Sequence, residues 1–323
     1  MTQVAAAPPE LSIAATPPLP SGAGRRRGRR AGRALGWVGP PLAVLGLSFV
    51  YPLVLLARRS LSPSTGSGWT VDQYNELVHS SVFLHSLVTT IEISGTAAVG
   101  CVVFGLVLSI SLSFVAFRGG GVVGRLIDMI IAFPSFLIVL AFIFLYGSTG
   151  AVNVGIQHVF ALSHPPITFL YSPVGSICAE VVYYTPFVVR PMLAAYSQMD
   201  DHLIEAAASL GARPWRVIVR VVLPYGIPSL LAGGSLALVL TVNEFGINLF
   251  LGAKSVMTLP LLIYSEAILQ SDLPAAAAVA LVNAVLSFGL YDIGPQDLRC
   301  PRECSGDRLA PTARVRSNQA AVA

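Results

Sequence analysis

The residues with the most evident chemistry are charged side chains inside long apolar stretches of this 323-residue chain, namely Glu92, Glu180, Arg190 and Glu244. A charge in the hydrocarbon core of a membrane is costly, so each is a candidate for function. Asn243 and Asn248 stand close to Glu244 and add polar groups to the same stretch. The cluster could line a pathway in which Glu244 meets a cationic group, with Glu180 nearby. It could equally supply hydrogen bonds between helices of a bundle.

Enzymatic chemistry finds little support in the sequence. A phosphate-binding loop needs Gly-Lys followed by Ser or Thr, yet the only lysine, Lys254, follows Ala253. The five histidines form no His-Glu-x-x-His or comparable metal-binding pattern. We therefore expect a chain that is not an enzyme and holds no metal or other cofactor.

The composition is that of a membrane protein. Hydrophobic residues make up 54% of the chain and charged residues only 11%, whereas soluble domains carry about 25% charged residues. A chain with this few charges cannot cover a water-exposed surface. Most of its surface must therefore face lipid or other apolar chains. The 20 Lys and Arg residues against 16 Asp and Glu form no basic face, and we expect no nucleic-acid partner.

Six apolar runs are long enough to cross about 30 Å of hydrocarbon, which takes about 20 helical residues. We predict an all-α protein with six transmembrane helices within residues 35–291. The six predicted spans are Leu35–Ala57, Ser86–Phe117, Leu126–Tyr146, Pro173–Tyr196, Ser229–Leu251 and Pro274–Tyr291.

The arginines predict the orientation of these spans. With the N-terminus in the cytoplasm, the inner loops hold five arginines, whereas the outer loops hold only Arg58, Arg59 and Lys254. Cytoplasmic loops are enriched in Lys and Arg, so we expect both termini in the cytoplasm. Arg190 would lie near the inner end of the fourth span, where its side chain could reach the interface.

The two ends of the chain have a different composition. Residues 1–34 are rich in Pro and Ala and then in Arg, and residues 292–323 are polar and rich in Pro. Neither segment has the apolar residues that would offset the entropy of ordering it. We predict a disordered, basic N-terminus and a disordered tail, both cytoplasmic.

The stretch between the fourth and fifth predicted spans, residues 200–224, predicts two short helices joined at a bend. Asp200 or Asp201 can cap the first helix, and Gly211 can end it in a left-handed conformation. Pro214 suits the first turn of a second helix, and Pro224 should break that helix before the next span.

The first of these helices carries an apolar face. Leu203, Ala206, Ala207 and Leu210 recur at helical spacing beside the charged Glu205. Such a face could dock into a groove on another protein or lie on lipid headgroups. Periodicity alone does not separate these two interpretations.

A family resemblance separates them. The stretch resembles the cytoplasmic coupling loop of ABC importer permeases, whose pattern is E-A-A, three residues, G, nine residues and I-x-L-P. This chain has Glu205-Ala206-Ala207, then Gly211, then Val221-Val222-Leu223-Pro224, with Val in place of Ile as the one departure. The resemblance implies that this loop inserts into a cleft on the ATPase subunit, where Glu205 makes a polar contact and Gly211 permits the bend.

The resemblance extends over about residues 40–291. The segments 125–150, 185–191 and 232–254 are similar to permeases of 2-aminoethylphosphonate importers, and permeases for iron, sulfate or polyamines share much of the same scaffold. It implies the type I importer (MetI-like) fold and alternating access in the bacterial inner membrane. The implied partners are ATPase subunits, a second permease, a periplasmic solute-binding protein and membrane lipid.

The resemblance bears on the role of the cluster around Glu244 and on the class of transporter. Importers of this type often leave recognition to the binding protein, so we favour hydrogen bonding between helices for the cluster around Glu244. An ion-coupled secondary transporter is the alternative, and it would be expected to have inverted repeats and discontinuous helices around buried charges. The coupling-loop pattern argues against a secondary transporter. The tail after Tyr291 departs from the short basic end that is usual in the family.

Overall fold

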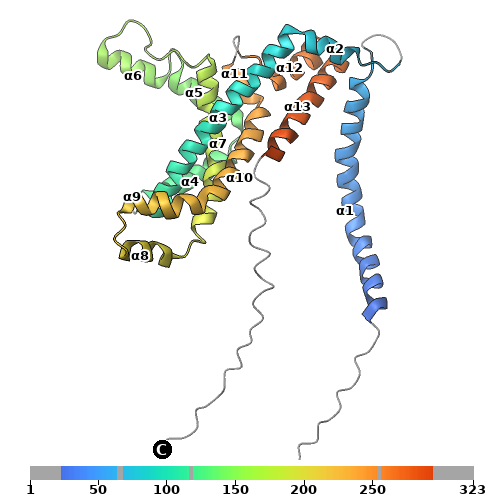
Figure 1. Cartoon of the computed structure of the whole chain (residues 1–323). Coiled ribbons are helices and arrows are strands. Elements are labelled where there is room, and N and C mark those ends of the chain that lie inside the picture. Colours follow the sequence, from blue (N-terminus) through green and yellow to red (C-terminus); the bar gives the residue numbers. More distant parts are fainter. Residues whose placement is uncertain (1–22, 64–67, 116–118, 253–255, 294–323) are drawn as a thin grey trace, which may run out of the picture. The chain divides into compact units, whose positions relative to one another are not determined.

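The computed structural model describes residues 23–63, 68–115, 119–252 and 256–293, and every regular element in these ranges is a helix (Figure 1). The chain divides into two compact units, Met1–Leu55 and Leu56–Ala323. Most of the predicted polar tail, from residue 294 onward, lies outside the described residues.

The first unit contains most of helix α1 (Ala23–Ser60), whose segment Trp37–Ser60 is apolar enough to span a membrane. The prediction of a disordered segment up to residue 34 differs from this result, because α1 already begins at Ala23. Alanine and arginine both favour helix, which offsets part of the ordering cost there. Residues 1–22 lie outside the described residues.

The second unit contains the end of α1 and the remaining helices. The longest are α3, α7, α10 and α13, and η1 and η2 are single π-helical turns. The bounds are α2 Asp72–His79, α3 Ser81–Phe114, α4 Gly120–Ala132, α5 Ser135–Tyr146, α6 Ala151–Phe160, α7 Pro173–Tyr196, α8 Asp201–Ser209, α9 Pro214–Val217, η1 Ile218–Val222, α10 Leu223–Val242, α11 Gly246–Leu251, α12 Leu259–Tyr264, η2 Ser265–Leu269 and α13 Leu273–Ile293.

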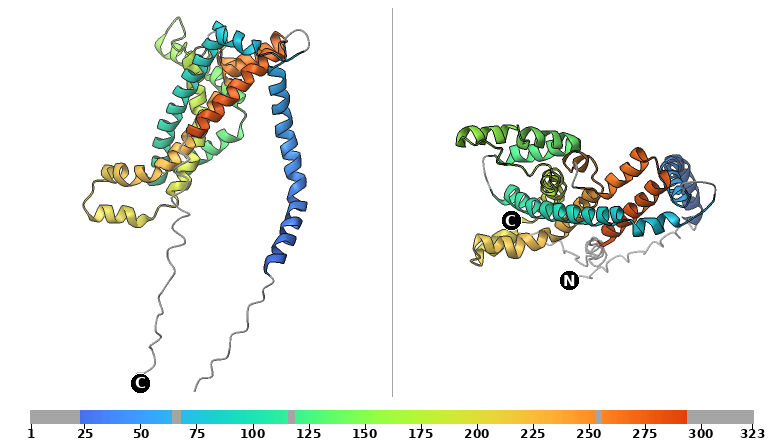
Figure 2. Two further views of the ribbon diagram at one scale, coloured as in Figure 1. Left: turned by 45° about the vertical axis from the view of Figure 1, so that its right-hand side comes forward. Right: turned by 90° about the horizontal axis from the view of Figure 1, so that it is seen from above.

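Helices α3, α7 and α10 pack against one another and form the centre of this unit (Figures 1 and 2). Glycines allow the close approach. A methyl group added at Gly233 of α10 would lie 2.9 Å from Cα of Val188 in α7, and one added at Gly105 of α3 would lie 2.7 Å from Cγ1 of the same valine. Small residues at helix contacts are typical of membrane bundles, where dispersion drives the packing.

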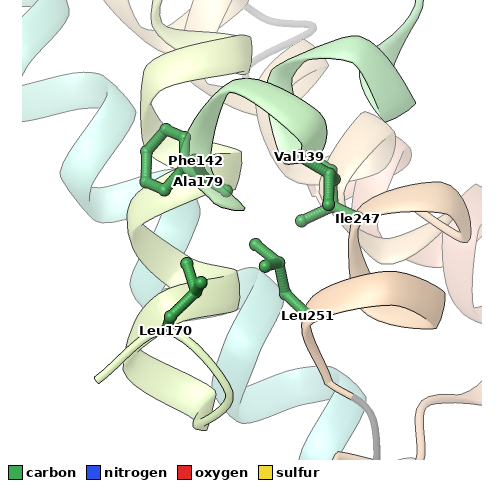
Figure 3. Close-up of a cluster of buried hydrophobic side chains, with 6 residues drawn as sticks. All are labelled: Val139, Phe142, Leu170, Ala179, Ile247 and Leu251. Atoms are coloured by element: carbon green, nitrogen blue, oxygen red, sulfur yellow. The ribbon is translucent and has the colours of Figure 1, made fainter. Parts of the chain in front are cut away.

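A second contact joins α5, α7 and α11 through a cluster of buried apolar side chains (Figure 3). Val139 and Phe142 come from α5, Ala179 from α7, and Ile247 and Leu251 from α11. Leu170, which precedes α7, completes the cluster and is 2% exposed. This cluster holds the short helix α11 beside the N-terminal half of α7.

The described residues contain five helical segments that are long and apolar enough to cross a membrane, where the sequence predicted six. The five are Trp37–Ser60, Ser81–Phe114, Ser135–Phe160, Pro214–Val242 and Leu273–Asp292. The predicted span Pro173–Tyr196 is the 24-residue helix α7, which has the length but not the hydropathy. Its hydropathy is lowered because it carries Glu180, Arg190 and three prolines.

Two predicted spans have wrong boundaries. The predicted helix Leu126–Tyr146 is broken between α4 and α5 at Phe133 and Pro134, because a proline disfavours the helical conformation of the residue before it. The predicted span Ser229–Leu251 instead begins at Pro214 and ends at Val242. Residues 243–245 interrupt the helix before α11 begins at Gly246.

The close contact between α7 and α10 allows a prediction about the free energy of unfolding. The substitution Gly233→Ala should lower the free energy of unfolding by about 1–3 kcal/mol, because the added methyl group meets backbone atoms that cannot move aside. Thermal unfolding of the purified chain in detergent measures this change. Gly95→Ala in α3 is the matched control, since nothing lies within 4 Å of its added methyl group. Equal unfolding temperatures for the two variants would contradict the predicted close packing.

Candidate functional site

The first helix of the predicted bent pair is α8, and both of its ends match the predicted signals. The side chain of Asp200 accepts a hydrogen bond from the backbone N–H of His202 at 3.0 Å, which makes Asp200 the cap. At the other end, Gly211 has a φ of +77°. The N–H groups of Gly211 and Ala212 donate to the carbonyls of Ala208 and Ala207 at 2.9 and 3.1 Å. This is the Schellman arrangement that ends a helix with a glycine.

The second helix of the pair differs from the prediction at Pro224. Pro214 does stand in the first turn of α9, but Pro224 does not break the helix that follows. Instead, α9 continues through the π-helical turn η1 into α10. The N–H of Leu223 donates to the carbonyl of Ile218, five residues back. The wider π turn changes the backbone register just before Pro224, which has no N–H to donate and would otherwise crowd the preceding turn.

The apolar side chains of this bend are exposed. Leu210 is 89% exposed, Trp215 57% and Leu203 48%. Ala206 and Glu205 are exposed as well, and Ala207 is half-buried. In contrast, Ile204 packs against a cluster of Met192, Tyr196, Met199 and Val222 at the end of the bundle. One side of α8 therefore attaches to the bundle, while the other presents apolar side chains that the described part of the chain leaves exposed.

Glu205 lies on the exposed side of α8. Its carboxylate Oε2 is 3.3 Å from Nδ1 of His202, one turn earlier. Of the predicted coupling residues, Glu205, Ala206, Ala207 and Gly211 gather on α8 and the turn after it. Leu223 and Pro224 lie beyond η1 in the first turn of α10. They therefore belong to the junction between the bend and the long helix.

The buried polar cluster connects α7 with the break between α10 and α11. Glu180, Glu244 and Asn248 are 0%, 6% and 1% exposed. Nδ2 of Asn248 donates to Oε1 of Glu180 at 2.9 Å and to the carbonyl of Glu244 at 3.3 Å. The carboxylate of Glu244 accepts hydrogen bonds from the hydroxyl of Tyr184 and from the N–H of Ile247, the latter at 2.8 Å.

Asn243 does not join this cluster, although the sequence grouped it there. Its Nδ2 donates to Oγ of Ser287 at 2.9 Å, and its Oδ1 accepts from Nδ2 of Asn283 at 3.0 Å. Both partners lie on α13. The interrupted stretch 243–245 thus makes polar contacts with α7 on one side and with α13 on the other, as the helix-to-helix interpretation requires.

Arg190 has a partner that the sequence prediction missed. Its guanidinium forms an ion pair with the carboxylate of Asp128 in α4, and both side chains are about half exposed. The prediction that the Arg190 side chain could reach the interface did not include this ion pair. Tyr184 was also missed, although it stands one helical turn after Glu180.

Comparisons with known proteins agree on one class. Residues 101–293 match the family model described as "Binding-protein-dependent transport system inner membrane component". The chain is 46% identical over 261 residues to the "Putative 2-aminoethylphosphonate transport system permease protein PhnU" of Salmonella paratyphi A, covering 81% of this chain and 90% of that protein. It is 25% identical over 231 residues to the putrescine transport system permease protein PotI of Escherichia coli, covering 70% and 78% respectively.

The fold also has a counterpart among solved structures. A chain of a bacterial ABC transporter involved in the import of the acidic polysaccharide alginate superimposes with a TM-score of 0.73. The match covers 86% of this chain and 99% of that chain at 18% sequence identity. At this identity the likeness concerns the fold.

The buried cluster makes a prediction of its own. Tyr184→Phe should lower the free energy of unfolding by about 1–3 kcal/mol, because it leaves a buried carboxylate oxygen of Glu244 without its donor. The control is Tyr183→Phe, whose hydroxyl donates to the carbonyl of Phe133 at a partly exposed position. Thermal unfolding in detergent compares the two variants. A larger loss for the Tyr183 variant would contradict the role given to Tyr184.

Proposed function

The chain belongs to the family of binding-protein-dependent transport system inner membrane components, and from that membership we propose that it is the permease subunit of an ATP-driven importer for 2-aminoethylphosphonate. The family membership makes it a multi-pass inner-membrane transport protein. The substrate, the coupling residues and the orientation are parts of the proposal.

The sequence identity to PhnU supports 2-aminoethylphosphonate as the substrate. The identity of 46% extends over 81% of this chain and 90% of that protein, whereas the identity to the putrescine permease is 25%. Four PhnU proteins of Salmonella match at 45–46%. A relative this similar over its full membrane region supports a shared substrate. Putrescine and sulfate are the substrates named for more distant relatives and are the competitors to test.

The bend at α8 and α9 is the proposed contact with the motor. Its exposed side carries Leu203 and Leu210 next to Glu205, a mixture of apolar anchors and one charge that suits insertion into a groove. The groove would belong to a separate ATPase subunit, which binds the ATP. Each cycle of ATP-driven closure then moves the bend, and the bundle alternates between its two openings.

The remaining partners follow from the same proposal. A second permease, identical or homologous, faces this one across the pathway, and a periplasmic binding protein delivers the solute. The N- and C-termini and the bend lie in the cytoplasm. The distribution of arginines supports this orientation, because Arg213, Arg216 and Arg220 all lie in or next to the bend. Apolar side chains that are exposed along α1 would contact lipid or another subunit.

Uptake by the reconstituted transporter tests the substrate. Proteoliposomes that contain this chain, its ATPase and its binding protein should accumulate radiolabelled 2-aminoethylphosphonate when ATP is present. Unlabelled 2-aminoethylphosphonate should compete at equimolar concentration, whereas putrescine and sulfate should not. Accumulation of putrescine or sulfate in place of the phosphonate would overturn the assigned substrate.

The same assay tests the coupling bend. Glu205→Ala and Gly211→Val should each reduce ATP-driven uptake at least about tenfold, because loss of a central interface contact typically costs 2 kcal/mol or more. Valine is also strained at the positive φ of Gly211. Ser209→Ala, at an exposed position of α8, is the matched control and should transport normally. Normal uptake by both coupling variants, with normal amounts of protein in the membrane, would refute the proposed contact.

A further inference from the structure

The buried cluster around Glu180 contains more hydrogen-bond acceptors than donors. Oε2 of Glu180 and Oδ1 of Asn248 are both buried, and neither has a hydrogen-bond partner among the residues that the structure describes. The hydroxyl oxygen of Ser176, which is also buried, has no partner either. Ser176 stands four residues before Glu180 on α7, so the two side chains share one face of the helix. A buried polar group without a partner costs free energy, so three at one place need an explanation.

The same cluster holds two carboxyl groups that meet few hydrogen-bond donors. The carboxylate of Glu244 is engaged by two donors, from Tyr184 and from the backbone of Ile247. Glu180 receives only one hydrogen bond, from Asn248. Of the helices that pack against α7, α5, α10 and α11 contain no Lys, Arg or His, whereas α3 contains His85 and α4 contains Arg125, both exposed. The one cation of α7, Arg190, is ten residues away and pairs with Asp128.

The chemical type of the three unpaired atoms indicates which kind of ligand they would bind. All three are oxygens, from a carboxylate, an amide and a hydroxyl, and oxygen ligands of this kind favour hard cations over transition metals. Of the three side chains only Glu180 has a carboxyl group, and its ionised form matches a single positive charge, whereas Ca²⁺ sites gain affinity from several carboxylates.

The backbone at this place has the form that ion sites in membranes use. The helix is interrupted at residues 243–245, between α10 and α11, and the carbonyl of Glu244 points to Asn248. Interrupted helices beside buried carboxylates bind Na⁺ in other transport proteins. We propose that Glu180, Asn248 and Ser176 form a binding site for a monovalent metal cation of the Na⁺ type, which ties α7 to α11. This inference does not depend on the substrate assigned above.

The cation dependence of stability tests the proposal. The full chain, purified in detergent, is unfolded thermally in NaCl, KCl or N-methylglucamine chloride at constant ionic strength. Saturating Na⁺ or K⁺ should raise the unfolding temperature by about 5 °C relative to the organic cation, as a ligand at about 100 times its Kd would. Glu180→Gln should abolish this rise. Glu92→Gln, which removes an exposed carboxylate from α3, should keep it.

A second variant keeps the test decisive if Glu180→Gln does not fold. Ser176→Ala removes one neutral oxygen, so the concentration of Na⁺ or K⁺ that gives half of the rise should increase at least about threefold. An unchanged half-saturating concentration would overturn the site as built here. Equal unfolding temperatures of the wild type in all three salts would also overturn the proposal. This includes the result in which the unfolding temperature of the wild type depends on pH but not on the metal cation. A full rise in the Glu180→Gln variant would place the ion elsewhere and also refute the proposal.

Discussion

The contact of Gly233 with the backbone of Val188 fixes α10 against α7, and most other features of the bundle depend on it. Because the two backbones come this close, the polar side chains beyond them can meet at short range. Tyr184 then reaches Glu244, and Asn248 reaches Glu180. In hydrocarbon, such groups must find partners within the protein, so close packing and the polar network stabilise one another.

The second constraint is the continuity from α9 through η1 to α10. A helix that runs from Pro214 to Val242 transmits a displacement at its N-terminal end along its whole length, since a hydrogen-bonded helix is stiff. A bend that is attached to the bundle through Ile204 and exposes Leu210 is well placed to receive such a displacement. The interruption at residues 243–245 ends the rigid segment where the buried carboxylates lie. Motion of the motor would thus arrive at the polar network.

Local signals in the sequence predicted local structure well. Asp200, Gly211 and Pro214 each act through their own backbone or the next turn, so the ends of α8 and the start of α9 could be predicted from residue types alone. Pro224 misled the prediction because a π turn, which depends on the packing of the helix, accommodates it. The partners of Glu180, Glu244 and Arg190 could not be predicted, because each lies on another helix and hydropathy does not indicate which helices face one another. The interruption at Pro134 had a visible signal, but the long apolar composition around it concealed the break.

The most direct test of the central claim asks which side of the membrane the bend faces and what it touches. A cysteine introduced as Leu210→Cys, in a chain whose native cysteines are replaced by alanine, is exposed to a membrane-impermeant maleimide. The account predicts labelling in inside-out vesicles, none in intact spheroplasts, and protection of the cysteine when the ATPase subunit is bound. Labelling from the outer face, or labelling that the bound ATPase leaves unchanged, would contradict it.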